Sequence, residues 1–395
     1  MVKKRESTNN TKAHQMNKTI LFFTIIMIIF GAIMIFDASV YQADQPPFND
    51  PFHFLKLHLI WLCISLVPSI IIIYWDYRKF SKLITPILII NIILLIAVLF
   101  AQDVNGARRW LHLGSDHIVI QPAEFIKPVF IVYIATLLAK ESKNFKTFKE
   151  AFYQGFGKRM IGFGAVLGLV LLLIIMEPDL GTTMVIGITA FAIFLASGRD
   201  YAHLFGTAGI AGLFSLLAVF AAVIAPYRLS RVRTYLKLLF SGEIDDPQGA
   251  GYQMYQILIG IGSAGFWGKG FGQSRQRFGY LVEITAFTDS IFAVVLEELG
   301  MLGGILMIVA WMIFAHTGLK IAKNAPDNQG RLIAIGITFW LTSQALLNMG
   351  ANVGLVPLTG MPLPFLTYGG SGTMVAMIGM AILLNISRFT NEQKQ

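Results

Sequence analysis

The stretch TILFFTIIMIIFGAIMIF, residues Thr19–Phe36, carries no charged side chain and is long enough to cross a bilayer core of about 30 Å as a helix. Similar runs recur along the 395-residue chain, which is 55% apolar and only 13% charged. Because hydrocarbon offers the backbone no water, such runs must form helices or a closed barrel. Their unbroken apolarity excludes the alternating pattern of barrel strands. We therefore predict ten transmembrane helices. The expected ranges are Thr19–Phe36, Phe54–Tyr74, Leu83–Ala101, Ala123–Leu138, Ile161–Met176, Thr182–Ala196, Leu204–Ile224, Ser290–Ala315, Leu332–Met349 and Leu363–Ile386.

The distribution of basic residues predicts how these helices are oriented. The chain has 31 Lys and Arg against 22 Asp and Glu, a net charge of +9. With the N-terminus inside, the short outer loops carry only Lys56, Arg108 and Arg109, whereas most other basic residues fall on the inner side. This asymmetry is the positive-inside pattern. It explains the basic balance without a nucleic-acid partner.

We expect an all-α polytopic membrane protein, a bundle of about ten transmembrane helices over residues 19–388 with cytoplasmic tails at 1–18 and 389–395. Residues 225–288 form one large extracytoplasmic loop, since long loops are translocated regardless of their charge. The only cysteine, Cys63, lies inside a predicted span, and the seven histidines show no ligand spacing. No cluster of residues therefore demands a metal.

The large outer loop has two recognisable parts. Ser230–Phe240 places apolar residues at helical spacing beside arginine and lysine, which is typical of an amphipathic interfacial helix. Further on, six glycines between positions 260 and 272 indicate tight packing or backbone exposed to a ligand. Lys269 lies within this glycine run, and we predict that it contacts substrate.

Asp289 stands where the large loop re-enters the membrane, and it is the strongest candidate for chemistry. A charge at the membrane edge is costly and is therefore a functional hypothesis by default. The N-terminus of the following helix would favour its ionised form. An ionised aspartate beside a sugar hydroxyl can act as a general base. The alternative is a helix N-cap, a role that Thr288 could fill instead.

Arg108, Arg109 and Trp110 lie together on the outer side after the third predicted span. Two guanidinium groups can hold phosphate oxygens in a bidentate fork, and an adjacent indole can lie against a sugar or a lipid. The alternative is an interfacial anchor of the kind that tryptophan and arginine form in many membrane proteins.

Two further pairs of charged residues lie near the outer ends of predicted spans. Glu124 and Lys127 are three residues apart and share a helix face, so they form either an internal ion pair or a contact to substrate. Glu177 and Asp179 flank a tight turn, where they could hold a cation or cap the next helix. The cap is the better interpretation for this pair.

The segment from Val356 to Gly372 contains three prolines and several glycines just where the last span enters the membrane. Irregular backbone at that depth is tolerated only where it lines protein or a watery cavity. We therefore expect a cavity here, with Ser371 among the residues that contact substrate.

Seven segments, taken together and in this order, resemble the SEDS family of shape, elongation, division and sporulation proteins, whose members include FtsW, RodA and SpoVE. They are NGARRW (105–110), QPAEFIK (121–127), EPDLGTT (177–183), DPQGAGYQMYQ (246–256), GIGSAGFWGKGFG (260–272), FTDSIFAVVLEELG (287–300) and NMGANVGLVPLTGMPLPFLTYGGSG (348–372). The resemblance covers Thr19 to Arg388. The motif around Asp289 departs from the family's pattern, since Phe287 stands where the family has histidine.

The resemblance implies a peptidoglycan glycosyltransferase of the bacterial cytoplasmic membrane. Such an enzyme polymerises lipid II, the undecaprenyl-pyrophosphate-linked disaccharide-pentapeptide, into β-1,4-linked glycan strands for division or cell shape. It implies Asp289 as the catalytic residue. The implied partners are a class b penicillin-binding protein, which is the transpeptidase, and other membrane proteins of the divisome or elongasome. A divalent cation, Mg or Mn, stays open as a cofactor.

Two other functions compete with this interpretation. A lipid II flippase would need charges that track across the membrane, but the polar motifs gather at the outer face, and the main deep acids are Glu297 and Glu298. A scaffold that only recruits the transpeptidase leaves Asp289 and the arginines unexplained. Within the family, the segments around Gly251 and Gly270 favour the division-type branch.

Overall fold

The computed structural model describes residues 15–103, 107–112, 119–139, 157–198, 209, 212, 226–249, 251–278 and 285–390. Within these ranges the chain is almost entirely helical. The helices are α1 (Lys18–Asp44), α2 (His53–Tyr74), α3 (Tyr77–Phe80), α4 (Ile84–Val98), α5 (Pro122–Leu138), α7 (Gly157–Met176), α8 (Leu180–Ser197), α10 (Pro226–Ser241), α11 (Tyr252–Ala264), α12 (Ile291–Lys323), α13 (Asn328–Asn352) and α14 (Gly370–Ser387), with single 3₁₀ turns at Ser81–Leu83 and Gln276–Phe278. A two-residue antiparallel ribbon pairs β1 (Leu111–His112) with β2 (Val119–Ile120).

The predicted helical bundle is confirmed. Seven helices of the described residues are long and apolar enough to cross a membrane, and the protein is a multi-pass membrane protein. The 17-residue α5 and the helix α7 correspond to two more of the predicted spans. The predicted span Leu204–Ile224 lies outside the described residues. The last span begins later than predicted, because residues 363–369 are not helical and α14 starts at Gly370.

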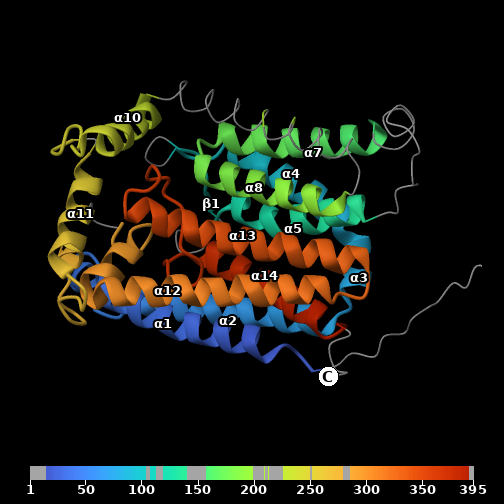
Figure 1. The fold of residues 1–395 in the computed structure, drawn as a ribbon, viewed down its shortest axis with the longest axis horizontal. Helices are drawn as coiled ribbons and strands as arrows, with labels where there is room; N and C mark the ends of the chain where they lie inside the picture. Colours follow the sequence, from blue (N-terminus) through green and yellow to red (C-terminus); the bar gives the residue numbers. More distant parts are fainter. Residues whose placement is uncertain are drawn as a thin grey trace, which may run out of the picture.

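The two ends of the bundle differ in character. Figure 1 shows α10 and α11 at one end, which we call the loop end, and α3 at the opposite end. The start of α1 and the close of α14 meet at that opposite end, where the backbone N–H of Asn17 donates to the Ser387 hydroxyl at 3.1 Å. The outer loop and the two ends of the described chain thus lie at opposite ends of the bundle, in agreement with the predicted topology. Which end faces the cytoplasm stays a prediction.

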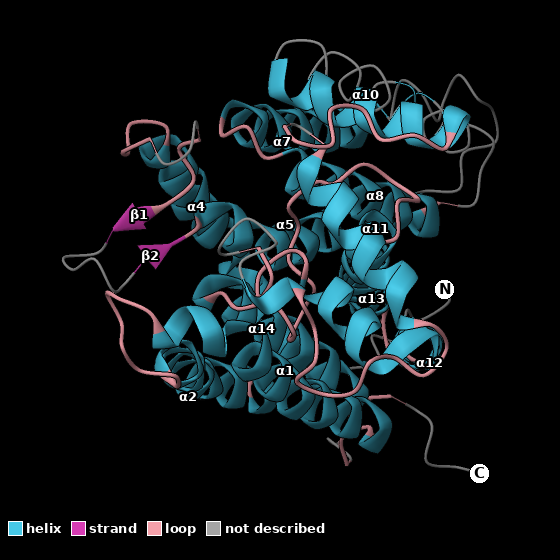
Figure 2. Ribbon diagram, turned by 90° about the vertical axis from the view of Figure 1, so that its left-hand side faces the viewer, coloured by secondary structure: helices cyan, strands magenta, loops and turns pink. Residues whose placement is uncertain are grey.

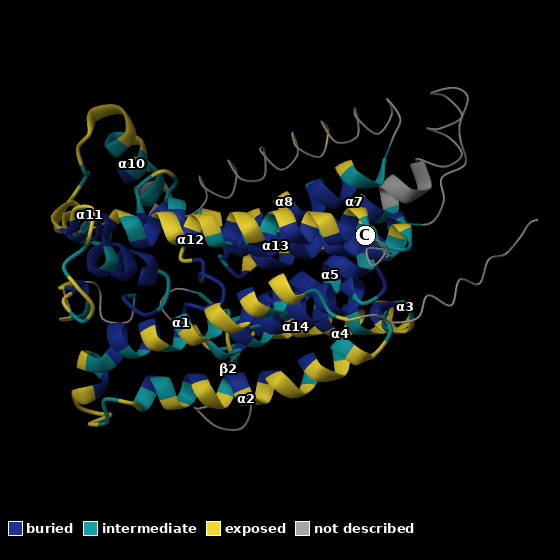
Figure 3. Ribbon diagram, turned by 60° about the horizontal axis from the view of Figure 1, so that its bottom comes forward, coloured by how far each residue is buried: buried dark blue, intermediate teal, exposed yellow. Residues whose placement is uncertain are grey.

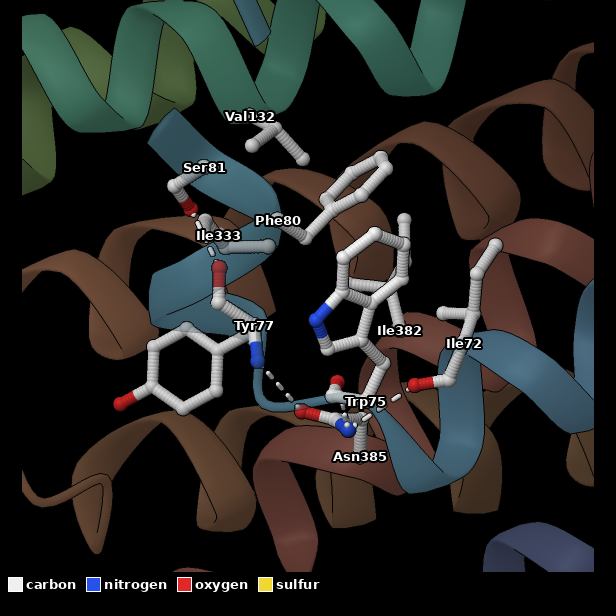
Figure 4. Close-up of a pocket in the computed structure, with 9 residues that line it drawn as sticks. All are labelled: Ile72, Trp75, Tyr77, Phe80, Ser81, Val132, Ile333, Ile382 and Asn385. Atoms are coloured by element: carbon white, nitrogen blue, oxygen red, sulfur yellow. Dashed lines mark hydrogen bonds between the residues drawn. The ribbon is translucent and has the colours of Figure 1, made fainter. Parts of the chain in front are cut away.

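A buried side chain ties the opposite end together. Asn385 on α14 donates its amide to the carbonyls of Ile72 and Ile73, 2.9 Å away, and of Trp75, 2.8 Å away. Its oxygen accepts the N–H of Tyr77 at 3.2 Å (Figure 4). One asparagine therefore satisfies the carbonyls that the end of α2 leaves without helical partners.

The helices fall into a central and a peripheral set. Seen from the loop end, α14 and α5 lie in the middle and the others surround them (Figure 2). In the most apolar window of α14, 78% of residues are buried, against 22% in α2. Figure 3 shows the exposed residues along α2, and they are mainly apolar, including Ile60, Ile64 and Val67. This is the pattern expected where lipid rather than water covers a surface.

The 33-residue α12 is broken at Gly300, which takes the left-handed backbone angle φ of +66°. A Cβ atom at this position would overlap the backbone of Phe266 and Gly268 in the outer loop. Glycine is required here both by the backbone angle and by the close approach of the loop. The break divides α12 into a short segment at the loop end and a long membrane-spanning part.

Replacing Gly300 with alanine should therefore destabilise the protein. A backbone with φ of +66° and ψ of −166° is open essentially to glycine alone and costs a residue with a Cβ atom about 1–3 kcal/mol, and the overlap adds to that. The matched control is Gly262→Ala in α11, where a Cβ atom meets nothing within 4 Å and alanine is the better helix former. We expect the thermal midpoint in detergent to fall for Gly300→Ala but not for Gly262→Ala. Equal midpoints would contradict the assigned role of Gly300.

Candidate functional site

A cavity of about 260 Å³ lies at the loop end of the bundle. Its walls come from the start of α5, the turn before α12, the irregular segment before α14 and the first turn of α14. The lining residues are Trp110, Gln121, Glu124, Thr288, Asp289, Gln344, Gly360, Pro362, Leu363, Pro364, Phe365, Thr367, Tyr368, Gly369, Ser371, Gly372 and Thr373. The cavity expected from the prolines and glycines of residues 356–372 is therefore present.

Asp289 reaches the cavity from a turn that is held by side chains of α13. The amides of Asn348 and Asn352 both donate to the Asp289 carbonyl, at 2.8 and 3.0 Å. The Thr367 hydroxyl donates to the Thr288 carbonyl at 2.8 Å. These contacts fix the backbone of Asp289, whose carboxylate accepts the Thr288 hydroxyl at 3.1 Å and lines the cavity, where the residue is half-buried.

The irregular segment before α14 forms the opposite wall. Gln344 donates to the Pro362 carbonyl at 2.9 Å, and Asn348 also donates to the Met361 carbonyl at 2.7 Å. Phe365 is buried in a left-handed conformation, with φ of +71°. Its carbonyl lies so close to Gly31 on α1 that a Cβ atom there would overlap it. The wall is thus held by protein partners on both sides, as non-helical backbone at membrane depth requires.

The surroundings of Asp289 suit a proton acceptor. Burial raises the pKa of its carboxyl, while the Thr288 hydroxyl, the Arg231 guanidinium and the Gln253 amide oppose that shift. A general base works best when its pKa lies near the working pH, so a pKa above the usual aspartate value favours this role. Arg231 comes from α10 and also donates to the Leu358 carbonyl at 3.0 Å.

Glu124 and Lys127 form a buried ion pair, with 2.6 Å between the Lys127 Nζ and Glu124 Oε1 atoms. Lys127 also donates to the Gln344 side chain at 3.1 Å. Of these two residues, only Glu124 lines the cavity, so Lys127 lies behind Glu124. Ser371, as predicted, lines the cavity, and its hydroxyl accepts the N–H of Gln121 at 3.1 Å. The ion pair is thus present, and its glutamate is also available to a ligand.

The two arginines after the third span have their guanidinium groups on backbone carbonyls. Arg108 donates to Leu99 at 3.0 Å, and Arg109 donates to Glu177 at 3.1 Å and to Pro178. Neither arginine lines the cavity, whereas Trp110 does. The sequence predicted that all three contact substrate, and the structure brings only the tryptophan to the cavity wall.

The Glu177–Asp179 turn contains a helix cap. Asp179 accepts the N–H of Thr182 at 3.0 Å as the N-cap of α8, so the preferred interpretation of this residue is confirmed. Glu177 is fully buried, and its carboxyl oxygens have no hydrogen-bond partner among the described residues. Burial and the neighbouring Asp179 raise the pKa of Glu177 to about 9, against the opposing charge of Arg109. These surroundings favour the neutral form of the Glu177 carboxyl.

Lys269 does not line the cavity. Its Nζ atom lies 2.5 Å from Glu297 on α12, so the structure gives it an acidic partner instead of a place at the site. No group of three or more His, Cys, Asp or Glu side chains that could hold a metal occurs among the described residues.

The sequence analysis did not identify the residues of other helices that bond to the Asp289 backbone or act on its carboxylate. Arg231 and Gln253 come from the outer loop, while Asn348 and Asn352 come from α13. The two asparagines are four residues apart and so share one helix face. That spacing was a usable signal, since two amides on one face of an apolar helix need partners inside the bundle.

Comparison with known proteins gives consistent matches over the whole chain. The family model described as "Cell cycle protein" and labelled FtsW/RodA/SpoVE matches residues 17–392. Stage V sporulation protein E of Bacillus subtilis is 35% identical over 385 residues, which cover 96% of this chain and 99% of that protein. The probable peptidoglycan glycosyltransferase FtsW of Legionella pneumophila is 35% identical, with 91% of this chain and 88% of that protein covered.

Solved structures confirm the fold. One chain from a study of polymerization and crosslinking by a peptidoglycan synthase complex superimposes with a TM-score of 0.73, at 22% identity, over 94% of this chain and 98% of that chain. The rod shape determining protein RodA of Thermus thermophilus gives a TM-score of 0.65, at 21% identity, over 95% of this chain and 98% of its own.

The Glu124–Lys127 pair should behave as a unit in stability measurements. Removing one partner of a buried pair leaves an uncompensated charge and costs about 3–5 kcal/mol. We therefore expect Glu124→Gln and Lys127→Met each to lower the thermal midpoint more than the double variant does. Strictly additive effects in this cycle would show that the two charges do not interact.

Proposed function

The chain belongs to the FtsW/RodA/SpoVE family of cell cycle proteins, and from that premise we propose that it is a peptidoglycan glycosyltransferase that polymerises lipid II. The observation that carries the proposal is Asp289, a half-buried carboxylate in the wall of a cavity at the loop end of the bundle. FtsW relatives named probable peptidoglycan glycosyltransferases are 32–35% identical over most of their length. The fold shared with RodA supports the same assignment.

In the proposed reaction Asp289 removes the proton from the 4-hydroxyl of the acceptor sugar. The hydroxyl oxygen forms a bond to the anomeric carbon of the donor, on the face opposite the pyrophosphate. The bond from that carbon to the pyrophosphate oxygen breaks, and undecaprenyl pyrophosphate leaves with the electron pair. Configuration at the carbon inverts, so an α-linked donor yields a β-1,4 bond. The raised pKa of Asp289 supports its role as the proton acceptor.

The leaving pyrophosphate needs positive charge in its surroundings. Arg108 and Arg109 were predicted to hold phosphate oxygens, and Lys127 to contact either Glu124 or substrate, but in this structure their cationic groups contact backbone carbonyls or Glu124. Arg231 is the basic residue whose charge acts on Asp289. We therefore assign the main electrostatic role at the site to Arg231, with Trp110, which lines the cavity, contacting the lipid or sugar part of the substrate.

We place the cavity on the outer face of the cytoplasmic membrane, with both termini in the cytoplasm. The distribution of basic residues supports this orientation, and the outer loop and the chain ends lie at opposite ends of the bundle. A class b penicillin-binding protein is the proposed partner, because a related fold was solved in work on a peptidoglycan synthase complex. Identities of 35% to both FtsW and SpoVE proteins are compatible with a division or a sporulation branch.

The flippase alternative receives less support. Transport would need acids spaced along a path through the bundle, and the deep acids Glu297 and Glu298 are instead engaged by the loop that precedes them. The cavity that Asp289 lines lies at the loop end of the bundle. A site at one face is what an enzyme that works at the membrane surface needs.

Replacing Asp289 with asparagine should abolish polymerisation of purified lipid II. A general base typically contributes about 10²–10⁴-fold to the rate, and asparagine keeps the size of the side chain. We expect the variant to keep its thermal midpoint and its binding to the transpeptidase. The assay should be run with and without that partner, since we expect weak activity alone. Normal glycan yield from a folded Asp289→Asn protein would refute the assignment.

Arg231→Ala should lower the polymerisation rate, because it removes the positive charge that we assign to the leaving pyrophosphate. Arg231→Lys should restore part of that rate, since an ammonium supplies charge without the planar fork. The matched control is Arg233→Ala, two residues along α10, whose side chain is exposed. Rates that match between the Arg231→Ala and Arg233→Ala proteins would contradict the role assigned to Arg231.

A further inference from the structure

The break at Gly300 leaves a short, fully enclosed segment at the start of α12. Residues 291–298 are all buried, whereas exposed apolar side chains begin at Met301 and continue to Leu319. The enclosed segment follows Asp289 by a single residue, Ser290. Any movement of this segment therefore moves the proposed base.

The outer loop replaces the helical hydrogen bonds that the break removes. In an unbroken helix, the N–H groups of residues 301 and 302 would bond to the carbonyls of 297 and 298. Here the N–H groups of Lys269 and Gly270 take those carbonyls, both at 3.0 Å. In return, the N–H groups of Met301 and Leu302 bond to the carbonyls of residues 265 and 266, at 3.2 and 3.1 Å. Four backbone hydrogen bonds thus connect the loop to the two sides of the break in α12.

Side chains add further contacts between the loop and α12. The Glu297 carboxylate accepts hydrogen bonds from the Lys269 ammonium at 2.5 Å and from the Ser274 hydroxyl at 2.7 Å, and both donors belong to the loop. The neighbouring Glu298 accepts the N–H of Ser274 at 3.0 Å. Arg277, at the end of the loop, pairs with the buried Asp37 of α1 at 2.7 Å. The loop is therefore attached to α1 and to both glutamates of α12.

The opposite end of the enclosed segment is held by other elements. Gln253, in the first turn of α11, donates to the Ser290 hydroxyl at 3.0 Å. Asn348 and Asn352 hold the Asp289 carbonyl from α13. One continuous piece of the outer loop, from Gln253 to Arg277, thus contacts the enclosed segment at both ends.

We propose that residues 265–277 form a clamp on the start of α12, and that Glu297 is a positioning residue for Asp289 that acts through this clamp. The proposal rests on the function proposed above, because it explains how the base of that reaction is held. It also gives Lys269 a role other than substrate contact. A partner that moves the loop would move the base without touching the cavity.

The first test compares variants of the Lys269–Glu297 pair by steady-state kinetics of lipid II polymerisation, in the complex with the transpeptidase. A small misplacement of a catalytic group can cost about 10²-fold in rate. We expect Glu297→Gln and Lys269→Met each to lower kcat by about 10- to 100-fold with KM unchanged. The double variant should be no worse than either single variant, and Lys269→Arg should retain most of the activity.

The matched control is Asp245→Asn, which removes an ion pair with Lys237 in the same outer loop, away from α12. We expect it to keep the parent kcat. A raised KM for Lys269→Met with normal kinetics for Glu297→Gln would overturn the clamp in favour of substrate contact by Lys269. Unchanged kcat for Glu297→Gln would overturn the positioning role.

The second test does not depend on activity. Hydrogen exchange is measured for residues 286–299 in Asp289→Asn protein, with and without Glu297→Gln. We expect faster exchange in these residues when Glu297 is replaced, and no change in α14. Identical exchange would overturn the clamp. If the parent protein did not polymerise lipid II, the proposed function would be rejected. The clamp would still be tested, because the exchange measurement does not depend on activity.

Discussion

Backbone that leaves the helical conformation inside a membrane bundle must find its hydrogen-bond partners in the protein, because lipid supplies none. Three irregular stretches of this chain meet this condition. The turn at Asp289 is held by Asn348 and Asn352. The segment before α14 is held by Gln344 and Asn348. The break in α12 is closed by the outer loop. The first two stretches line the cavity, the third lies further along α12, and each depends on partners from a distant part of the chain.

The same arrangement explains why the site can carry a carboxylate. Asp289 is enclosed enough for burial to raise its pKa, yet Arg231, Thr288 and Gln253 keep the ionised form accessible. Glu177 shows the opposite case, since its carboxyl has no hydrogen-bond partner among the described residues and its pKa rises to about 9. Burial raises the pKa of both acids, but only Asp289 has a hydroxyl, an amide and a guanidinium that oppose the shift through hydrogen bonds and charge, whereas Glu177 has the charge of Arg109 alone.

Phe287 shows how the structure accommodates a residue that departs from the family's motif. It stands where the family has histidine, and it is fully buried against Phe54 and Tyr368, with ring centroids 4.6 and 5.8 Å apart. The Tyr368 N–H also bonds to the Phe287 carbonyl at 2.9 Å. An aromatic cluster therefore supports the turn next to Asp289, and the contacts that hold the Asp289 backbone involve other residues.

The sequence alone determined the membrane bundle, the loop that precedes Asp289, the cavity before the last helix and the Glu124–Lys127 pair. These follow from local properties: the length of apolar runs, the cost of charge near lipid and the spacing of residues on one helix. The tertiary structure decided which basic residue acts on Asp289. Arg108, Arg109 and Lys269 carry the right chemistry, but backbone carbonyls and Glu297 engage them, whereas Arg231 acts on Asp289 from 58 positions away. The sequence shows which residues are charged, but the partner of each charged side chain depends on how helices that are distant in the sequence pack together.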